Sequence, residues 1–221
     1  MRQKDDSVFA TALNNLAVGK LSPEEVKLFT RIISDISSIP TNALRLFRTN
    51  AEVNAYNDSV FEVHPNVMVV NVVDRVIGSV SDSVKLGLLK SVQSAELHKT
   101  YSLLTTLKMA VGIHFMVTNN ISIADGLVNG AVGVLKHIEF GCNDEVIRLW
   151  IYFNEAQVGK ECRASFLSIS RQLKLDSTWT PISKVCRNIR PWEKSPAVVT
   201  RRQFPVIPAE AITIHKSQGG T

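Results

Sequence analysis

The densest group of chemically useful side chains lies at the end of the chain. Within residues 211–219 the sequence supplies hydroxyl, imidazole, ammonium and amide groups, from Thr213, His215, Lys216, Ser217 and Gln218. Spread over about two helical turns, such groups can hold the phosphates and sugars of one nucleic-acid strand without reading its bases. An exposed polar helix end would use the same residue types. The apolar run before the segment, residues 204–214, favours binding over that alternative.

A second candidate site lies at the start of an expected helix. Residues 43–47 have the composition of a short strand, and Thr49 and Glu52 have the spacing of a capping box. This pattern predicts a helix from about Asn50 toward Phe61. Because free backbone N–H groups at a helix start favour a phosphate, Thr49 and Asn50 are candidate phosphate contacts. A plain helix cap is the alternative role for Thr49.

The remaining elements indicate a mixed α/β protein. Apolar spacing predicts a helix over residues 5–18, and Ser22 with Pro23 and Glu25 predicts a second capped helix. Residues 67–80 read as one or two strands and residues 84–97 as a short helix. Between about residues 103 and 153, short β-branched runs alternate with turn signals, which predicts a small barrel or antiparallel sheet. Asn129-Gly130 is predicted to form a tight hairpin turn there.

Composition narrows the class of protein. The chain has 221 residues, 45% of them hydrophobic and 20% charged, as in a globular protein rather than a disordered tail. The net charge of +5 permits an anionic partner, and basic residues crowd the last third, at Arg187, Arg190, Lys194, Arg201 and Arg202. The three cysteines lack zinc-site spacing, and without a signal peptide they fit an intracellular, reducing compartment. No apolar run is long enough for a membrane span.

Four segments resemble conserved motifs of Pif-type DNA helicases of superfamily one. Residues 211–219 are similar to the fifth motif, although Gly220 stands where the family commonly has leucine. Residues 103–112, 115–120 and 127–133 resemble the stretch that builds a small barrel inserted into the second RecA-like domain. Residues 46–57 resemble a strand-to-helix motif that contacts single-stranded DNA in relatives. Met1-Arg2-Gln3 matches the end of a motif whose arginine reaches the terminal phosphate of the nucleotide.

The resemblance implies a fold and a set of site residues. The fold is a partial RecA-like domain with a parallel sheet plus an inserted small β-barrel. Residues 1–100 would form the first part of that domain, residues 101–155 the barrel, and residues 156–221 a basic segment and the return to the RecA-like domain, cut at its end. Arg2 would be an arginine finger, and Arg2, Gln3 and Gly219 would face the nucleotide. The DNA-binding set would be Thr49, Asn50, Thr213, His215, Lys216, Ser217 and Gln218, with no metal ligand.

The function implied is that of a C-terminal part of an ATP-dependent 5′-to-3′ DNA helicase in repair, recombination or telomere maintenance. The complete enzyme would use ATP and Mg²⁺ and would be nuclear or mitochondrial if eukaryotic. The sequence has no Gly-x-x-x-x-Gly-Lys-Ser/Thr loop, so this chain is expected to bind neither cofactor and not to hydrolyse ATP alone. Its expected partners are single-stranded DNA and a missing N-terminal motor domain, in cis or in a parent protein, with no membrane.

Two alternatives from other classes stay open. A noncatalytic single-strand-binding module, or a transposon-derived relic, would need only the barrel and the basic segment. An unrelated metabolic enzyme would need a clustered catalytic set, whereas His64, His98, His114 and His137 are scattered in the sequence.

Overall fold

A computed structural model describes residues 7–31, 39–40, 43–193 and 195–217. The chain divides into two compact units, residues 1–43 and residues 44–221. The first unit contains α1 (Ser7–Ala17) and α2 (Pro23–Thr30), as predicted. Ser22 and Glu25 form the predicted capping box at the start of α2, and the rings of Phe9 and Phe29 lie 5.8 Å apart between the helices.

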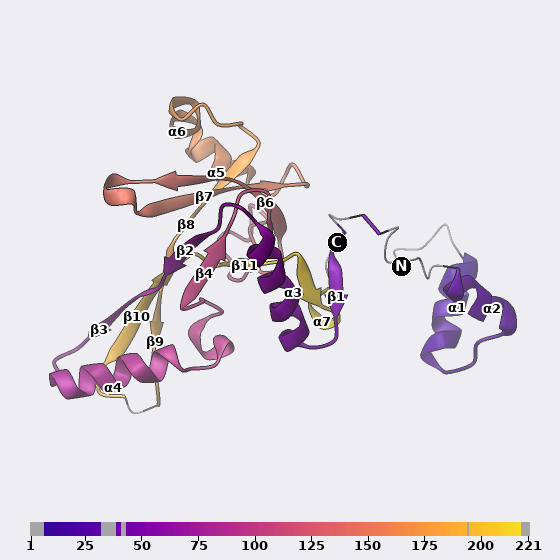
Figure 1. Ribbon diagram of the computed structural model, residues 1–221, viewed down its shortest axis with the longest axis horizontal. Coiled ribbons are helices and arrows are strands. Elements are labelled where there is room, and N and C mark those ends of the chain that lie inside the picture. The colour runs from indigo at the N-terminus through magenta and orange to yellow at the C-terminus, as the bar shows by residue number, and fades with distance from the viewer. Residues whose placement is uncertain (1–6, 32–38, 41–42, 194, 218–221) are drawn as a thin grey trace. The chain divides into compact units, whose positions relative to one another are not determined.

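The second unit begins with a short strand and a capped helix. They are β1 (Arg45–Phe47) and α3 (Asn50–Val63), close to the predicted bounds. At the far end of the chain, β12 (Ala211–Thr213) precedes the short helix α7 (Ile214–Ser217). The strands β1 and β12 pair in parallel, with Phe47 opposite Thr213 (Figure 1). This two-stranded pair is the parallel sheet of the described chain.

The largest sheet has five antiparallel strands in the order β11-β5-β6-β7-β8. They are β5 (His114–Val117), β6 (Val132–Phe140), β7 (Val146–Phe153), β8 (Trp179–Ser183) and β11 (Val206–Pro208). The described strands form an open sheet with β8 and β11 at its edges, so the expectation of a barrel is corrected to an open antiparallel sheet. The edge strands β11 and β8 pair with β5 and β7, which lie much earlier in the sequence. Pairing over such distances leaves no local signal in the sequence.

The predicted hairpin turn at Asn129-Gly130 is also wrong. β5 and β6 are joined by a loop of residues 118–131, in which the Ala131 N–H donates to the Val128 carbonyl at 3.1 Å. Only Gly130 of the pair has a positive φ, of 100°, whereas a two-residue type I′ hairpin needs both. The pair therefore makes a turn inside a longer loop rather than closing a hairpin.

A second antiparallel sheet has the order β3-β10-β9, with β3 (Val73–Ile77), β10 (Val198–Gln203) and β9 (Val185–Ile189). The helix α4 (Asp82–Gln93) lies along one of its faces, where Leu88, Val92 and Val199 share a small core. The short strands β2 (Met68–Asn71) and β4 (Thr106–Met109) form a further pair.

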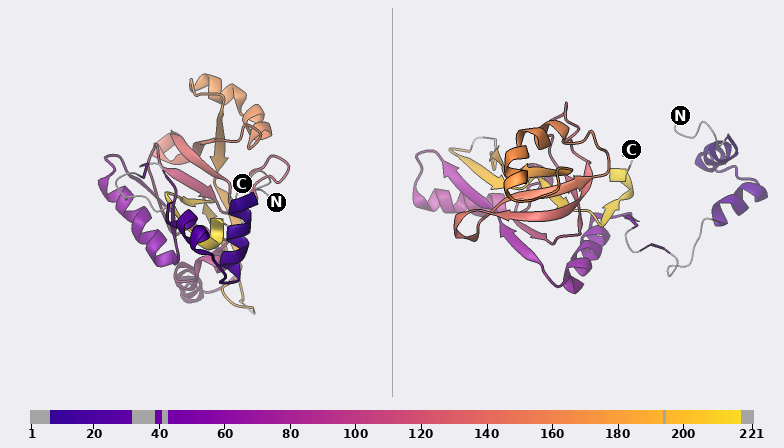
Figure 2. Two further views of the ribbon diagram at one scale, coloured as in Figure 1. Left: turned by 90° about the vertical axis from the view of Figure 1, so that its right-hand side faces the viewer. Right: turned by 90° about the horizontal axis from the view of Figure 1, so that it is seen from above.

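Short helices complete this unit. They are η2 (Leu97–Thr100), η3 (Cys142–Asp144), α5 (Lys160–Ser165) and α6 (Leu167–Gln172). Figure 1 and the left view of Figure 2 show α5 and α6 at one end of the unit and α4 at the other. None of the helices among the described residues is both long and apolar enough to cross a membrane. The domain boundaries at residues 100 and 155 stay a prediction.

Candidate nucleic-acid interface

The two candidate segments of the sequence meet at one edge of the parallel strand pair. Because β1 and β12 run in the same direction and in register, their carboxyl ends lie side by side. The α3 helix begins directly after β1, and α7 begins directly after β12. The carboxyl ends of parallel strands are where α/β proteins bind ligands. We call this the parallel-strand edge and define it by Thr49, Asn50, His215, Lys216 and Ser217.

At the β1 end, Thr49 is occupied as a helix cap. Its hydroxyl accepts from the Glu52 N–H at 3.2 Å, and its N–H and hydroxyl donate to the Glu52 carboxylate at 2.9 and 2.7 Å. These hydrogen bonds, first that of the hydroxyl, lower the pKa of Glu52, so a negative charge stays at the helix start. Asn50 is exposed and makes no side-chain hydrogen bond among the described residues. It is one side chain that this turn can offer to a ligand.

At the β12 end, two hydroxyl side chains hydrogen-bond to the protein backbone, and two basic side chains are exposed. Thr213 is buried, and its hydroxyl accepts from the Lys216 N–H at 3.3 Å, so it caps the last turn. The Ser217 hydroxyl donates to the Ile214 carbonyl at 2.7 Å. His215 and Lys216 are exposed. Partial desolvation lowers the pKa of the Lys216 ammonium, because nearby protein atoms displace some of its water.

Chemically, the parallel-strand edge presents an ammonium, an imidazole and an amide. Groups of this kind can bind phosphate oxygens and sugars, and such contacts carry no information about base sequence. Glu52 is the carboxylate next to them, and it is already bound by Thr49. The edge therefore suits a nucleic-acid backbone.

Asn57 holds this edge together from within the protein. Its buried amide nitrogen donates to the carbonyls of Ala211 at 3.2 Å and Pro208 at 3.3 Å, and its oxygen accepts from the Ala211 N–H at 2.9 Å. One side chain on α3 thus fixes the start of β12. No role for Asn57 was predicted from the sequence. Its signal was an amide placed four residues before Phe61 on the buried face of the helix.

A second, partly buried link ties β12 to the five-stranded sheet. Glu210, just before β12, accepts from the His114 N–H at 2.7 Å and lies 2.9 Å from its Nδ1. The hydrogen bond to Glu210 raises the pKa of His114. Although desolvation acts in the opposite direction, hydrogen bonds from His114 hold the pKa of Glu210 below its ordinary value. The raised pKa of His114 and the lowered pKa of Glu210 therefore favour an ion pair. This contact was not predicted from the sequence.

The other predicted site residues lie outside the described residues. These are Arg2 and Gln3, predicted to face the nucleotide, and Gln218 and Gly219 after α7. Within the described part of the chain, no group of three or more His, Cys, Asp or Glu side chains could hold a metal ion. The individual binding roles of all the site residues stay predictions.

Comparison with solved structures gives the fold. The chain is similar to the Pif1 helicase of Candida albicans, with a TM-score of 0.63 and 22% identity, over 100% of this chain and 47% of that one. It is similar to Bacteroides Pif1 bound to ssDNA, with a TM-score of 0.59 and 18% identity, over 99% of this chain and 42% of that one. Bacteroides Pif1 in complex with ADP-AlF3 and ssDNA matches with a TM-score of 0.56 and 18% identity, over 98% and 41%.

No family model and no curated protein matches the sequence. The structural likeness shows the fold: this is an α/β chain built like part of a helicase. More narrowly, it is the fold of Pif1 helicases, as the motif resemblance predicted. The chain spans less than half the length of these structures.

Proposed function

We propose that this chain is the strand-binding part of a Pif-type DNA helicase and that its parallel-strand edge holds the backbone of single-stranded DNA. The observation that carries the proposal is the parallel pairing of β1 and β12, which brings Asn50, His215 and Lys216 to one edge. The likeness to a Bacteroides Pif1 bound to ssDNA supports the choice of ligand. Backbone contacts of this kind would let the chain grip any sequence.

The activity proposed for the whole helicase is ATP-dependent 5′-to-3′ unwinding in repair, recombination or telomere maintenance. ATP and Mg²⁺ would supply the hydrolysis that drives stepping, with Arg2 as the arginine finger. The described residues include no Gly-x-x-x-x-Gly-Lys-Ser/Thr loop that could hold the phosphates of a nucleotide. No step of hydrolysis is therefore assigned to them, and their proposed contribution is to hold the strand.

One observation favours part of a larger motor domain over a noncatalytic module. In the β1–β12 pair Leu46 is 50% exposed, and Ile214, the residue that follows β12, is 51% exposed. Parallel sheets occur almost only with both faces covered, so this pair is suited to adding strands or helices. An independent module would bury these side chains itself. Sedimentation of the chain tests this, because a module would remain monomeric, whereas the proposed part would self-associate through its uncovered apolar surface.

The binding proposal is tested with Lys216→Ala. Fluorescence anisotropy of a labelled oligothymidine would be measured with the whole chain at several salt concentrations, beside Lys160→Ala, which removes an exposed lysine from α5. We expect Lys216→Ala to weaken binding and to lower the salt dependence of log K by about 0.7, the value for one phosphate contact on a single strand. We expect the same effect with mixed sequences. Equal affinities for the two variants, or a new base preference, would refute the proposal.

A further inference from the structure

The face of the β3-β10-β9 sheet opposite α4 is open. Side chains alternate along each strand, so α4 covers one set, including Val76, Ile189 and Val199, and the other set points away from the helix. We call this second set the outer face. Its members used here are Arg75, Ile77, Asn188, Val198, Thr200 and Arg202.

The outer face carries positive charge with little compensation. Arg75 and Arg202 are exposed, and Arg75 makes no ion pair among the described residues. Arg202 lies 3.9 Å from Glu145, but that carboxylate is 2.9 Å from Lys184, whose hydrogen bond lowers the pKa of Glu145. Neither arginine therefore has a carboxylate to itself, and both guanidinium groups are available to an anion.

The contrast with Arg201 shows that this exposure is specific to one face. Arg201 points toward α4, is 1% exposed, and binds Asp74 at 2.9 and 2.8 Å. Strand alternation thus separates a structural arginine from Arg202, its neighbour in sequence. The basic residues of the last third therefore do not all lie on one face of the sheet: Arg201 faces α4, and Arg202 lies on the outer face.

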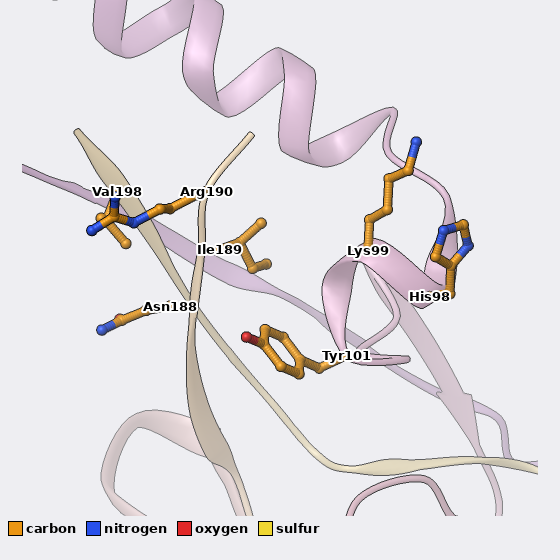
Figure 3. Close-up of a pocket in the computed structure, with 7 residues that line it drawn as sticks. All are labelled: His98, Lys99, Tyr101, Asn188, Ile189, Arg190 and Val198. Carbon is orange, nitrogen blue, oxygen red and sulfur yellow. The ribbon is translucent and has the colours of Figure 1, made fainter. Parts of the chain in front are cut away.

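A hollow of about 560 Å³ adjoins the outer face at its β9 edge (Figure 3). Its rim includes Lys99, Arg190 and Tyr101, all exposed, and neither Lys99 nor Arg190 has an ion pair in the described chain. Figure 3 shows Asn188 and Arg190 leaving β9 on one side and Ile189 on the other, facing Tyr101. The Tyr101 ring is half exposed, and His98 beside it pairs with Glu96 at 3.1 Å.

We propose that the outer face and this hollow form a second binding surface for a nucleic-acid backbone, separate from the parallel-strand edge. Arg75, Arg202, Arg190 and Lys99 bind phosphates, and Tyr101 stacks on a base of a single strand. A single strand that passes round the β9 edge would meet the arginines on one side and Lys99 with the exposed Tyr101 ring on the other. Cations together with an exposed aromatic ring are the combination that single strands bind. The proposal shares only its class of ligand with the proposed function, because no residue belongs to both surfaces.

The test compares Arg75→Ala/Arg202→Ala with Lys90→Ala/Lys160→Ala, which removes the same charge from exposed sites off the outer face. Anisotropy is measured with a fluorescein-labelled oligothymidine and with a duplex of equal length, over a range of salt. We expect the arginine variant to lower the single-strand salt slope by about 1.4, for two contacts at about 0.7 each. Arg75→Lys/Arg202→Lys should restore the slope, since it keeps both charges.

Tyr101→Leu separates the single strand from the duplex. We expect about tenfold weaker binding of the oligothymidine with an unchanged salt slope, because stacking is lost and no charge is removed. If the arginine variant matched the lysine variant on both DNAs, the second surface would be refuted. If the arginine variant bound DNA more weakly and Lys216→Ala bound it normally, the parallel-strand edge would be refuted and the outer face supported. If Lys216→Ala bound DNA more weakly and the arginine variant bound it normally, the outer face alone would be refuted.

Discussion

Replacing Asn57 by leucine should loosen the parallel-strand edge from within. The change removes three hydrogen bonds to the backbone of Ala211 and Pro208, and Ala211 is fully buried. A buried polar group left without a partner costs about 1–3 kcal/mol. Because the Ala211 N–H and at least one carbonyl lose their partner, we expect the free energy of unfolding to fall by about 2–4 kcal/mol.

The assay is urea unfolding followed by tryptophan fluorescence, since all three tryptophans lie in the unit of residues 44–221. The matched control is Asn54→Leu, the same chemical change on the exposed side of α3. We expect this control to change the free energy of unfolding by less than about 0.5 kcal/mol. Equal losses for the two variants would show that Asn57 does not hold β12, and the reasoning would fail.

Two further predictions concern ion pairs, one buried and one partly buried. Arg201→Ala should lower the free energy of unfolding by about 3–5 kcal/mol, because Asp74 would be left buried without its partner. Arg202→Ala should change the free energy of unfolding by under about 1 kcal/mol, because its ion pair is exposed. Comparable urea midpoints for the two variants would contradict this. For His114→Gln, the destabilisation relative to wild type should be largest between about pH 4.5 and 6.5, the ordinary pKa values of Glu210 and His114. The stability that His114 contributes is lost as pH rises through its raised pKa, and the stability that Glu210 contributes is lost as pH falls through its lowered pKa. A difference in the free energy of unfolding between wild type and His114→Gln that did not change with pH would refute the ion pair.

Features encoded by neighbouring residues were predictable from the sequence. The capping boxes at Ser22 and Thr49 each depend on a hydroxyl and a glutamate three residues apart, and both form as expected. The strand-to-helix step after Phe47 follows from the same local pattern. The motif resemblance placed the two candidate segments in one DNA-binding set, whereas the β1–β12 pairing that brings them together joins distant residues and had no local signal.

Features that depend on distant pairing were not predictable. The open five-stranded sheet needs β11 to pair with β5 about ninety residues earlier, and no local pattern specifies that register. Thr213 resembled a surface group in sequence, yet its burial directs its hydroxyl to the Lys216 N–H. Arg201 was counted with the other basic residues of the last third, because a count of charges ignores the alternation that a strand imposes, and it is buried.

Hydrogen–deuterium exchange with and without oligothymidine tests the central claim most directly. We predict slower exchange of the backbone amides of residues 47–52 and 213–217 together, because one strand contacts the carboxyl ends of both β1 and β12. Protection confined to other parts of the chain, such as α5 and α6, would contradict the assignment of the parallel-strand edge as the place where the strand is held.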